Sequence, residues 1–199
     1  MAFLRTSIVD RFGCAARRRW AAWCGVLAVL SAIGTGAFAQ TPVSAENQLK
    51  AVFLFNFAQF VKWPPRVFPE AQAPIVIGVL GDDPFGAYLD ELVRGEKIGE
   101  RPMVVRRFRR GEDLAECQIL FVSRSEAGRL DQIVAQLKGR SLLTVGDVDG
   151  FARQGGMVRF ATDSGKIQLR INMAAVQAAD LTISSKLLAH ATIVPPGKD

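Results

Sequence analysis

Three short and almost purely apolar runs recur through the middle of the chain, at residues 74–81, 118–122 and 141–145. Regular polar alternation is missing from them, which is typical of strands buried on both faces of a parallel sheet. Amphipathic segments between the runs have the apolar spacing of helices. This repeated order predicts an α/β fold whose mainly parallel sheet is flanked by helices.

Local signals predict where the intervening elements begin. Asp83 before Pro84 is a predicted N-cap for a short helix that ends near Val93. Ser125 is predicted to begin a second helix, which Gly139 ends. One more strand is expected around residues 103–105.

The last third of the chain has a different pattern. Residues 157–162 and 166–171 alternate between polar and apolar side chains, and Asp163-Ser164-Gly165 between them is a turn signal. A C-terminal antiparallel β-hairpin is therefore predicted, followed by short terminal helices over residues 172–179 and 184–191, with Asn172 and Ser184 as their predicted N-caps. Since no internal linker is visible, residues 40–199 are expected to form a single domain.

The first predicted helix, within residues 47–65, is rich in aromatic side chains. One apolar stripe at helical spacing consists of Leu49, Val52, Phe53, Phe57 and Phe60. Asn56 falls near the middle of that stripe, so it is expected to bond the backbone of a neighbouring segment or, alternatively, to line a ligand pocket. Leu54 and Phe55 lie off the stripe, which requires either a second covering layer or another molecule.

The N-terminal segment, residues 1–39, has the order of a secretory signal. Residues 1–19 carry five arginines and one acid, residues 20–39 are uncharged and apolar, and Ala37-Phe38-Ala39 has the small-residue pattern of a cleavage site. An uncleaved membrane anchor is the alternative, since about 20 apolar residues can span a bilayer. Both readings place residues 40–199 outside the cytoplasm, and the periplasm is the expected location.

The positive charge of the chain resides largely in this segment. Of 25 lysines and arginines against 19 acids, the segment holds five and one, so 20 against 18 are left. That small excess is no footprint for nucleic acid. Cys117 is the one cysteine after residue 39. Because it adjoins an apolar strand, it is expected to be buried and inert.

Groups that could carry catalysis or bind a metal are sparse. The chain has one histidine, His190, and no cluster of ligands at metal-site spacing. No Gly-x-Ser-x-Gly elbow and no Gly-rich phosphate-binding loop is present. The sequence therefore predicts no enzyme activity, no metal and no cofactor.

Several segments taken together resemble the YfiR family. They are residues 50–58 (Lys-Ala-Val-Phe-Leu-Phe-Asn-Phe-Ala), 60–64, 78–86 (Gly-Val-Leu-Gly-Asp-Asp-Pro-Phe-Gly), 117–123, Gly150-Phe151-Ala152 with Gly155-Gly156, Ile171-Asn172 and 183–188. The segments occur in the same order as in the family, and the resemblance covers about residues 46–194.

The resemblance implies a periplasmic regulatory protein without catalytic activity. Family members repress a membrane-bound diguanylate cyclase through its periplasmic sensor domain, which lowers cyclic di-GMP and biofilm formation. In the best-known system of the family, an OmpA-like outer-membrane lipoprotein titrates the repressor away. Family members are dimers, so a homodimer is expected, and they can carry internal disulfides. Cys117 resembles a family cysteine whose partner is missing here.

Two sets of candidate residues follow. A contact with a partner protein or a second copy would use Leu54, Phe55, Lys62 and Trp63. The alternative function is a periplasmic small-ligand-binding module that feeds a membrane sensor, because the carboxyl ends of parallel strands form a crevice. The loop Gly146-Asp147 lies at that edge, and the polar candidates for a ligand crevice are Asn56, Asp82, Asp83, Ser123, Ser125, Asn172, Ser185 and Lys186. Helix capping is the alternative role for several of these side chains.

The signal predicts a mature N-terminus at Gln40, because cleavage follows the small-residue site. N-terminal sequencing of protein recovered from the periplasm checks this prediction. Periplasmic material that begins at Met1 would show that the segment stays attached.

Overall fold

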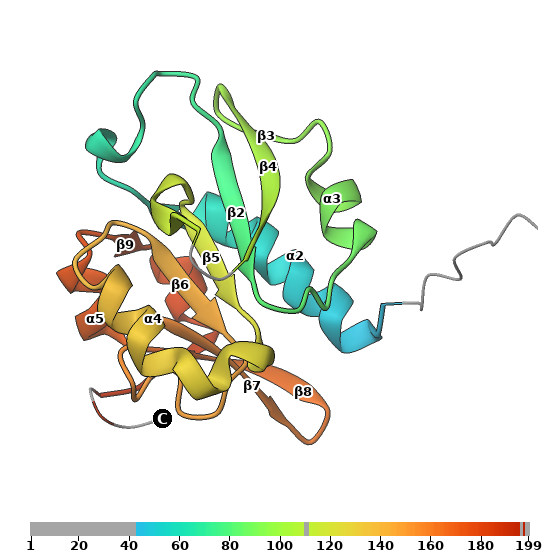
Figure 1. Cartoon of the computed structure of the whole chain (residues 1–199), viewed down its shortest axis with the longest axis vertical. Coiled ribbons are helices and arrows are strands. Elements are labelled where there is room, and N and C mark those ends of the chain that lie inside the picture. Colours follow the sequence, from blue (N-terminus) through green and yellow to red (C-terminus); the bar gives the residue numbers. More distant parts are fainter. Residues whose placement is uncertain (1–42, 110–111, 196, 198–199) are drawn as a thin grey trace, which may run out of the picture. The chain divides into compact units, whose positions relative to one another are not determined.

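The computed structural model describes residues 43–109, 112–195 and 197. The predicted signal at residues 1–39 lies outside these residues. Within them, the central sheet has eight strands in the order β10-β8-β7-β6-β5-β2-β4-β3 (Figure 1). The strands are β2 (Ile75–Leu80), β3 (Lys97–Ile98), β4 (Arg101–Phe108), β5 (Ile119–Val122), β6 (Leu143–Gly146), β7 (Val158–Asp163), β8 (Lys166–Ile171) and β10 (Ala191–Ile193).

The pairing of these strands confirms the predicted fold class. Strands β4, β2, β5, β6 and β7 run parallel to one another. Strands β7 and β8 form the predicted antiparallel hairpin, in which Asp163 pairs with Lys166. Strand β10 adds to β8 in parallel, and β3 is antiparallel to β4. A separate pair joins β1 (Val61–Lys62) to β9 (Thr182–Ile183).

Helices cover both faces of the sheet. The helical elements are α2 (Ala45–Phe60), η2 (Pro65–Val67), α3 (Ala87–Val93), η3 (Leu114–Glu116), η4 (Arg124–Arg129), α4 (Leu130–Leu137), α5 (Met173–Ala178) and α6 (Ser185–Leu188). One apolar core contains Ile77 and Val79 of β2 together with buried residues of α2, α3, α5 and α6. The second core contains Val76 and Leu80 of the same strand and buried residues of α4. Successive side chains of β2 therefore point to opposite faces of the sheet and pack into two different cores.

Two predicted helix starts are wrong by a few residues. Helix α3 begins at Ala87, because Asp83 closes a turn first: its Oδ1 accepts hydrogen bonds from the amides of Phe85 at 2.8 Å and Gly86 at 3.2 Å. Helix α4 begins at Leu130, after η4, and Ser125 does not cap it. The predicted caps of the terminal helices are confirmed, since Asn172 accepts from the Ala175 amide and Ser184 accepts from the Lys186 amide.

Helix α2 turns a different face to the sheet than its apolar stripe predicts. Its buried residues are Lys50, Ala51, Leu54, Phe57 and Ala58. Of the predicted stripe, Phe57 is fully buried, Phe53 and Phe60 are half-buried, and Leu49 is 46% exposed. The small side chains of Ala51 and Ala58 explain the choice, because they let the helix backbone approach the strands closely.

Asn56 consequently does not make the hydrogen bond to a neighbouring backbone segment that was predicted for it. Its side chain is half-buried, and within the described residues it makes no hydrogen bond. The expectation that its amide pins the helix to a neighbouring backbone segment is wrong, because the rotation of α2 moves Asn56 from the centre of the buried face to its border.

Aromatic rings connect α2 to the sheet. The Phe57 ring is 6.1 Å from Phe160 of β7, which is 6.4 Å from Phe121 of β5. Phe121 meets Phe85 edge to face at 4.8 Å. These separations allow the favourable offset and edge contacts of aromatic pairs. The chain of rings crosses the core beneath α2 and holds the helix over the strands.

Replacing Phe57 by alanine should lower the free energy of unfolding by about 3 to 5 kcal/mol, because it removes a fully buried ring and leaves a cavity. Phe55→Ala is the matched control on the same helix, and its half-buried ring should cost distinctly less. Urea denaturation of both variants measures the difference. Equal losses would mean that Phe57 is not the anchor of α2.

Candidate functional site

The carboxyl ends of β2, β5 and β6 lie at one edge of the sheet, because these strands are parallel neighbours. The chain leaves β2 through α3 to reach β4 on one side and later returns to β5 on the other side. This reversal of strand order is the position at which open α/β sheets usually bind ligands. A ligand site is therefore expected at this position.

Hydrogen bonds join the loops at this edge to one another. The Asp82 amide donates to Ser125 Oγ at 2.9 Å, which joins the β2 and β5 loops. Arg124 Nη2 donates to the Asp147 carbonyl at 3.1 Å, which joins the β5 and β6 loops. Gly81 has φ +90°, and a Cβ there would lie 2.5 Å from Ser125 Oγ. Only glycine fits this close approach.

Lys50 of α2 enters the same edge from above the sheet. Its ammonium is 2.9 Å from Asp147 Oδ2 and 2.8 Å from Glu46 Oε1, and the side chain is only 3% exposed. A buried ammonium requires such partners, since its desolvation costs several kcal/mol. The network therefore ties the first turns of α2 to the end of β6.

Glu46 adds the outer part of the network. Its Oε1 also accepts a hydrogen bond from Thr162 Oγ1 of β7 at 3.1 Å. The hydrogen bond from Lys50 lowers the pKa of the Glu46 carboxyl below 4.5, with smaller support from the charges of Lys50 and Arg124. Because the pKa of Glu46 is lower in the folded state, the ionised Glu46 carboxylate stabilises the fold. This stabilisation is present above about pH 4.5 and is lost as the pH falls through the lowered pKa.

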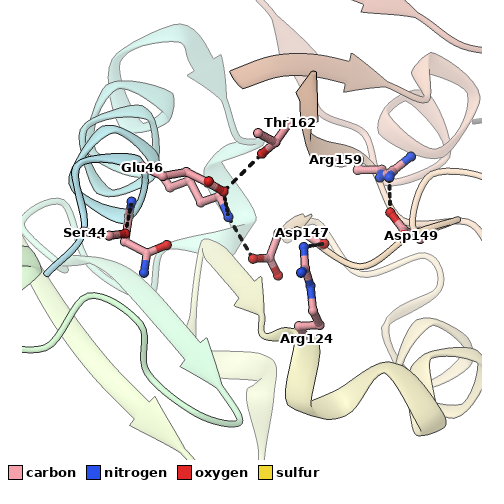
Figure 2. A network of polar contacts seen from close by, with 9 residues as sticks. Ser44, Glu46, Arg124, Asp147, Asp149, Arg159 and Thr162 are labelled. Atoms are coloured by element: carbon pink, nitrogen blue, oxygen red, sulfur yellow. Dashed lines mark hydrogen bonds and ion pairs between the residues drawn. The ribbon is translucent and has the colours of Figure 1, made fainter. Parts of the chain in front are cut away.

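One atom of the network has no hydrogen-bond partner. Oδ1 of Asp147 is buried and accepts no hydrogen bond within the described residues, although Oδ2 of the same carboxylate accepts from Lys50. A buried acceptor without a donor costs about 1 to 3 kcal/mol. Nearby, Arg159 of β7 pairs with Asp149 (Figure 2). The edge thus holds a dense ionic cluster, and we call Glu46, Lys50, Arg124, Asp147 and Thr162 the carboxyl-edge network.

The predicted ligand-crevice residues fall into separate places. Asp82, Asp83, Ser123 and Ser125 do lie at the carboxyl edge. Asp83 is committed to the structure, because its Oδ2 is 2.9 Å from Arg107 Nε while its Oδ1 closes the turn before α3. The guanidinium of Arg107 also donates hydrogen bonds to both carboxylate oxygens of Asp90 at 2.6 Å. This hydrogen bonding raises the pKa of Arg107.

The remaining candidates lie at the opposite edge or on α2. Asn172 follows β8, which runs antiparallel to the parallel strands, so it lies at their amino ends. It is buried, donating from Nδ2 to the Ala152 carbonyl at 2.9 Å and accepting from the Ala175 amide at 3.1 Å. Ser185 and Lys186 are exposed on α6, beyond β9. A single crevice lined by all eight residues is therefore wrong.

The predicted contact residues are also divided. Leu54 is fully buried in the core between α2 and the sheet, so its assignment to a partner surface is wrong. Phe55 is half-buried against the same core. Trp63 donates from Nε1 to the Gln118 carbonyl at 3.1 Å, and Lys62 is exposed on β1.

Lys50 is the residue that sequence reasoning missed. Its spacing of four residues from Glu46 was the available signal, since such pairs bridge one helix turn. A lysine inside an aromatic helix otherwise reads as solvent-facing. Its burial could not be seen before Asp147 was placed opposite to it.

Cys117 is buried as predicted. Its thiol donates to the Leu114 carbonyl at 3.1 Å, and burial raises the pKa of the Cys117 thiol to about 12. At neutral pH it is therefore protonated and a weak nucleophile.

The sequence matches a known protein family. A family model described as YfiR/HmsC-like matches residues 47–192, well over half of the chain. No curated protein matches the chain. Over residues 43–109, 112–195 and 197, no three side chains of His, Cys, Asp or Glu are grouped to hold a metal ion, and no helix is both long and apolar enough to cross a membrane.

Lys50→Met should lower the free energy of unfolding by about 3 to 5 kcal/mol, because it leaves the Asp147 carboxylate buried without its cation. Adding Asp147→Asn to this variant should recover part of the loss, since the uncompensated charge is removed. Urea denaturation at pH 7 measures both.

Lys62→Met is the control for this pair, because it removes the same ammonium from an exposed position and should have little effect. A Lys50→Met variant as stable as Lys62→Met would show that the buried ion pair does not hold α2 in place.

Proposed function

The chain belongs to the YfiR/HmsC-like family, and we propose that it regulates a diguanylate cyclase pathway by protein contact. In its finer form, the proposal is that the protein represses a membrane-bound diguanylate cyclase by binding the periplasmic sensor domain of that enzyme. Cyclic di-GMP and biofilm formation then fall. The observation that supports this is the family match, which extends from α2 to β10.

A regulator of this kind needs differential binding rather than catalysis. It must bind one conformation of its partner more tightly than another. A preference of about 100-fold corresponds to roughly 2.7 kcal/mol, which a few well-placed apolar anchors can supply. The candidate anchors are therefore apolar side chains that the core leaves exposed.

One such side chain, Leu49, lies on α2, beside two aromatic side chains that pack against the core and are only partly covered by it. Leu49, Phe53, Asn56 and Phe60 share one side of the helix by their spacing. Leu49 is the most exposed of the four, Phe53 and Phe60 are half-buried, and Asn56 has no hydrogen bond of its own within the described residues. We name these four residues the outer face of α2 and assign the partner contact to it. Phe55, Lys62 and Trp63 remain proposed contacts beside this face.

The setting of this contact is also part of the proposal. We infer that the protein acts in the periplasm after removal of its signal, as a homodimer, and that an OmpA-like outer-membrane lipoprotein competes for it. The family resemblance supports these partners. A second candidate function, small-ligand binding, is favoured by a cavity between α4 and α5 with a volume of about 480 Å³.

The contact is tested in cells of the natural host from which the gene has been deleted. Deletion should raise cyclic di-GMP, and the wild-type gene should restore the low level. Leu49→Glu should fail to restore it, because a carboxylate in an apolar contact is expected to weaken binding about tenfold or more. Cyclic di-GMP is measured by mass spectrometry.

Gln59→Glu is the matched control, since it adds the same charge at an exposed polar position of α2. It should restore repression, and both variants should melt at the wild-type temperature because neither position is buried. An unchanged cyclic di-GMP level on deletion would refute the repressor role. Full repression by Leu49→Glu would refute the outer face of α2 as the contact.

A further inference from the structure

We propose that the cavity between α4 and α5 binds a small organic anion with a flat apolar body. The cavity has a volume of about 480 Å³, within the range of pockets that hold small molecules. None of its lining residues belongs to α2 or to the carboxyl-edge network. The inference therefore deepens the second candidate function, small-ligand binding, on which it rests, and does not depend on the proposed protein contact.

Small side chains keep the cavity open. On one wall, Ala174, Ala175 and Ala178 of α5 leave the space that longer side chains would occupy. Val134 and Leu137 of α4 form the facing wall. Gly155 completes it, and a Cβ at that position would lie only 3.0 Å from Val134 Cγ1. These walls present mostly carbon atoms, so the body of the ligand must be apolar.

The polar groups of the cavity set the chemistry of the other end of the ligand. Thr144 lines the cavity and is itself buried, and its hydroxyl accepts from the Met157 amide at 3.0 Å. The hydroxyl proton has no acceptor among the described residues, so it is available to a ligand oxygen. Gln154 also lines the cavity and adds amide donors.

Lys138 determines which ligand charge the cavity favours. Lys138 is exposed, is one of the residues that line the cavity, and has no ion-pair partner within the described residues. No carboxylate lines the cavity. The lining therefore combines one cationic side chain, Lys138, with the hydrogen-bond donors of Thr144 and Gln154 and with apolar side chains. This combination favours an anion, such as a carboxylate or sulfonate attached to an apolar ring.

The test uses two fluorescent probes that share one apolar body. The first, 8-anilino-1-naphthalenesulfonate, is anionic, and the second, N-phenyl-1-naphthylamine, is its neutral counterpart. The purified wild-type protein should bind each probe saturably at one site. Lys138→Gln should weaken the anionic probe about two- to fivefold and leave the neutral probe unchanged, as expected for a solvent-exposed charge pair.

Ala178→Phe should weaken both probes about tenfold or more, because the ring fills the cavity from an exposed position of α5. Ala135→Phe is the matched control: Ala135 is exposed on α4 and does not line the cavity. Thermal melting of the three variants confirms that each is folded.

Several outcomes would overturn the proposal. These are the absence of saturable binding by the wild-type protein, binding that Ala178→Phe leaves intact, and an anionic probe that is insensitive to Lys138→Gln. A fourth would be a wild type that fails to bind the probes but loses self-association with Ala178→Phe, measured by size exclusion with light scattering. That result would assign the cavity to a second copy of the chain.

Discussion

Helix α2 can lie on the sheet only because the lysine that it carries into the interior meets a carboxylate there. An ammonium that is 3% exposed is unfavourable alone, and Asp147 at the end of β6 compensates it. At the other end of the helix, the Trp63 indole donates to the Gln118 carbonyl at the start of β5. The two contacts anchor α2 at both edges of the sheet. Between them, Ala51 and Ala58 allow the close approach that brings Phe57 into the chain of aromatic rings.

This anchoring explains why the aromatic stripe of α2 is not its buried face. Hydrophobic periodicity ranks faces by side-chain type, whereas the pairing of Lys50 with Asp147 and the small side chains of Ala51 and Ala58 together set the rotation of the helix. Leu54 and Phe57 then point into the core, and Leu49 is left at the surface. The residues predicted for burial and those predicted for contact have partly exchanged roles.

The fold was more predictable than the site for a physical reason. Continuous apolar runs such as residues 118–122 and a turn such as Asp163-Ser164-Gly165 are local signals, and they correctly predicted the strands, the hairpin and the mainly parallel sheet. The caps at Asn172 and Ser184 were equally local. The carboxyl-edge network joins residues about a hundred positions apart, as Lys50 and Asp147 show. No local pattern encodes such a pairing, so it emerges only when the strands are placed.

The segment between β6 and β7 brings the three regions of interest into one structure. It begins with Asp147, which holds Lys50 of α2, and it continues to Gln154 and Gly155 in the wall of the cavity. In its middle, the Ala152 carbonyl accepts from Asn172, which also caps α5 on the opposite wall. Through contacts at its start, middle and end, this segment therefore connects Lys50 of α2 with both walls of the cavity.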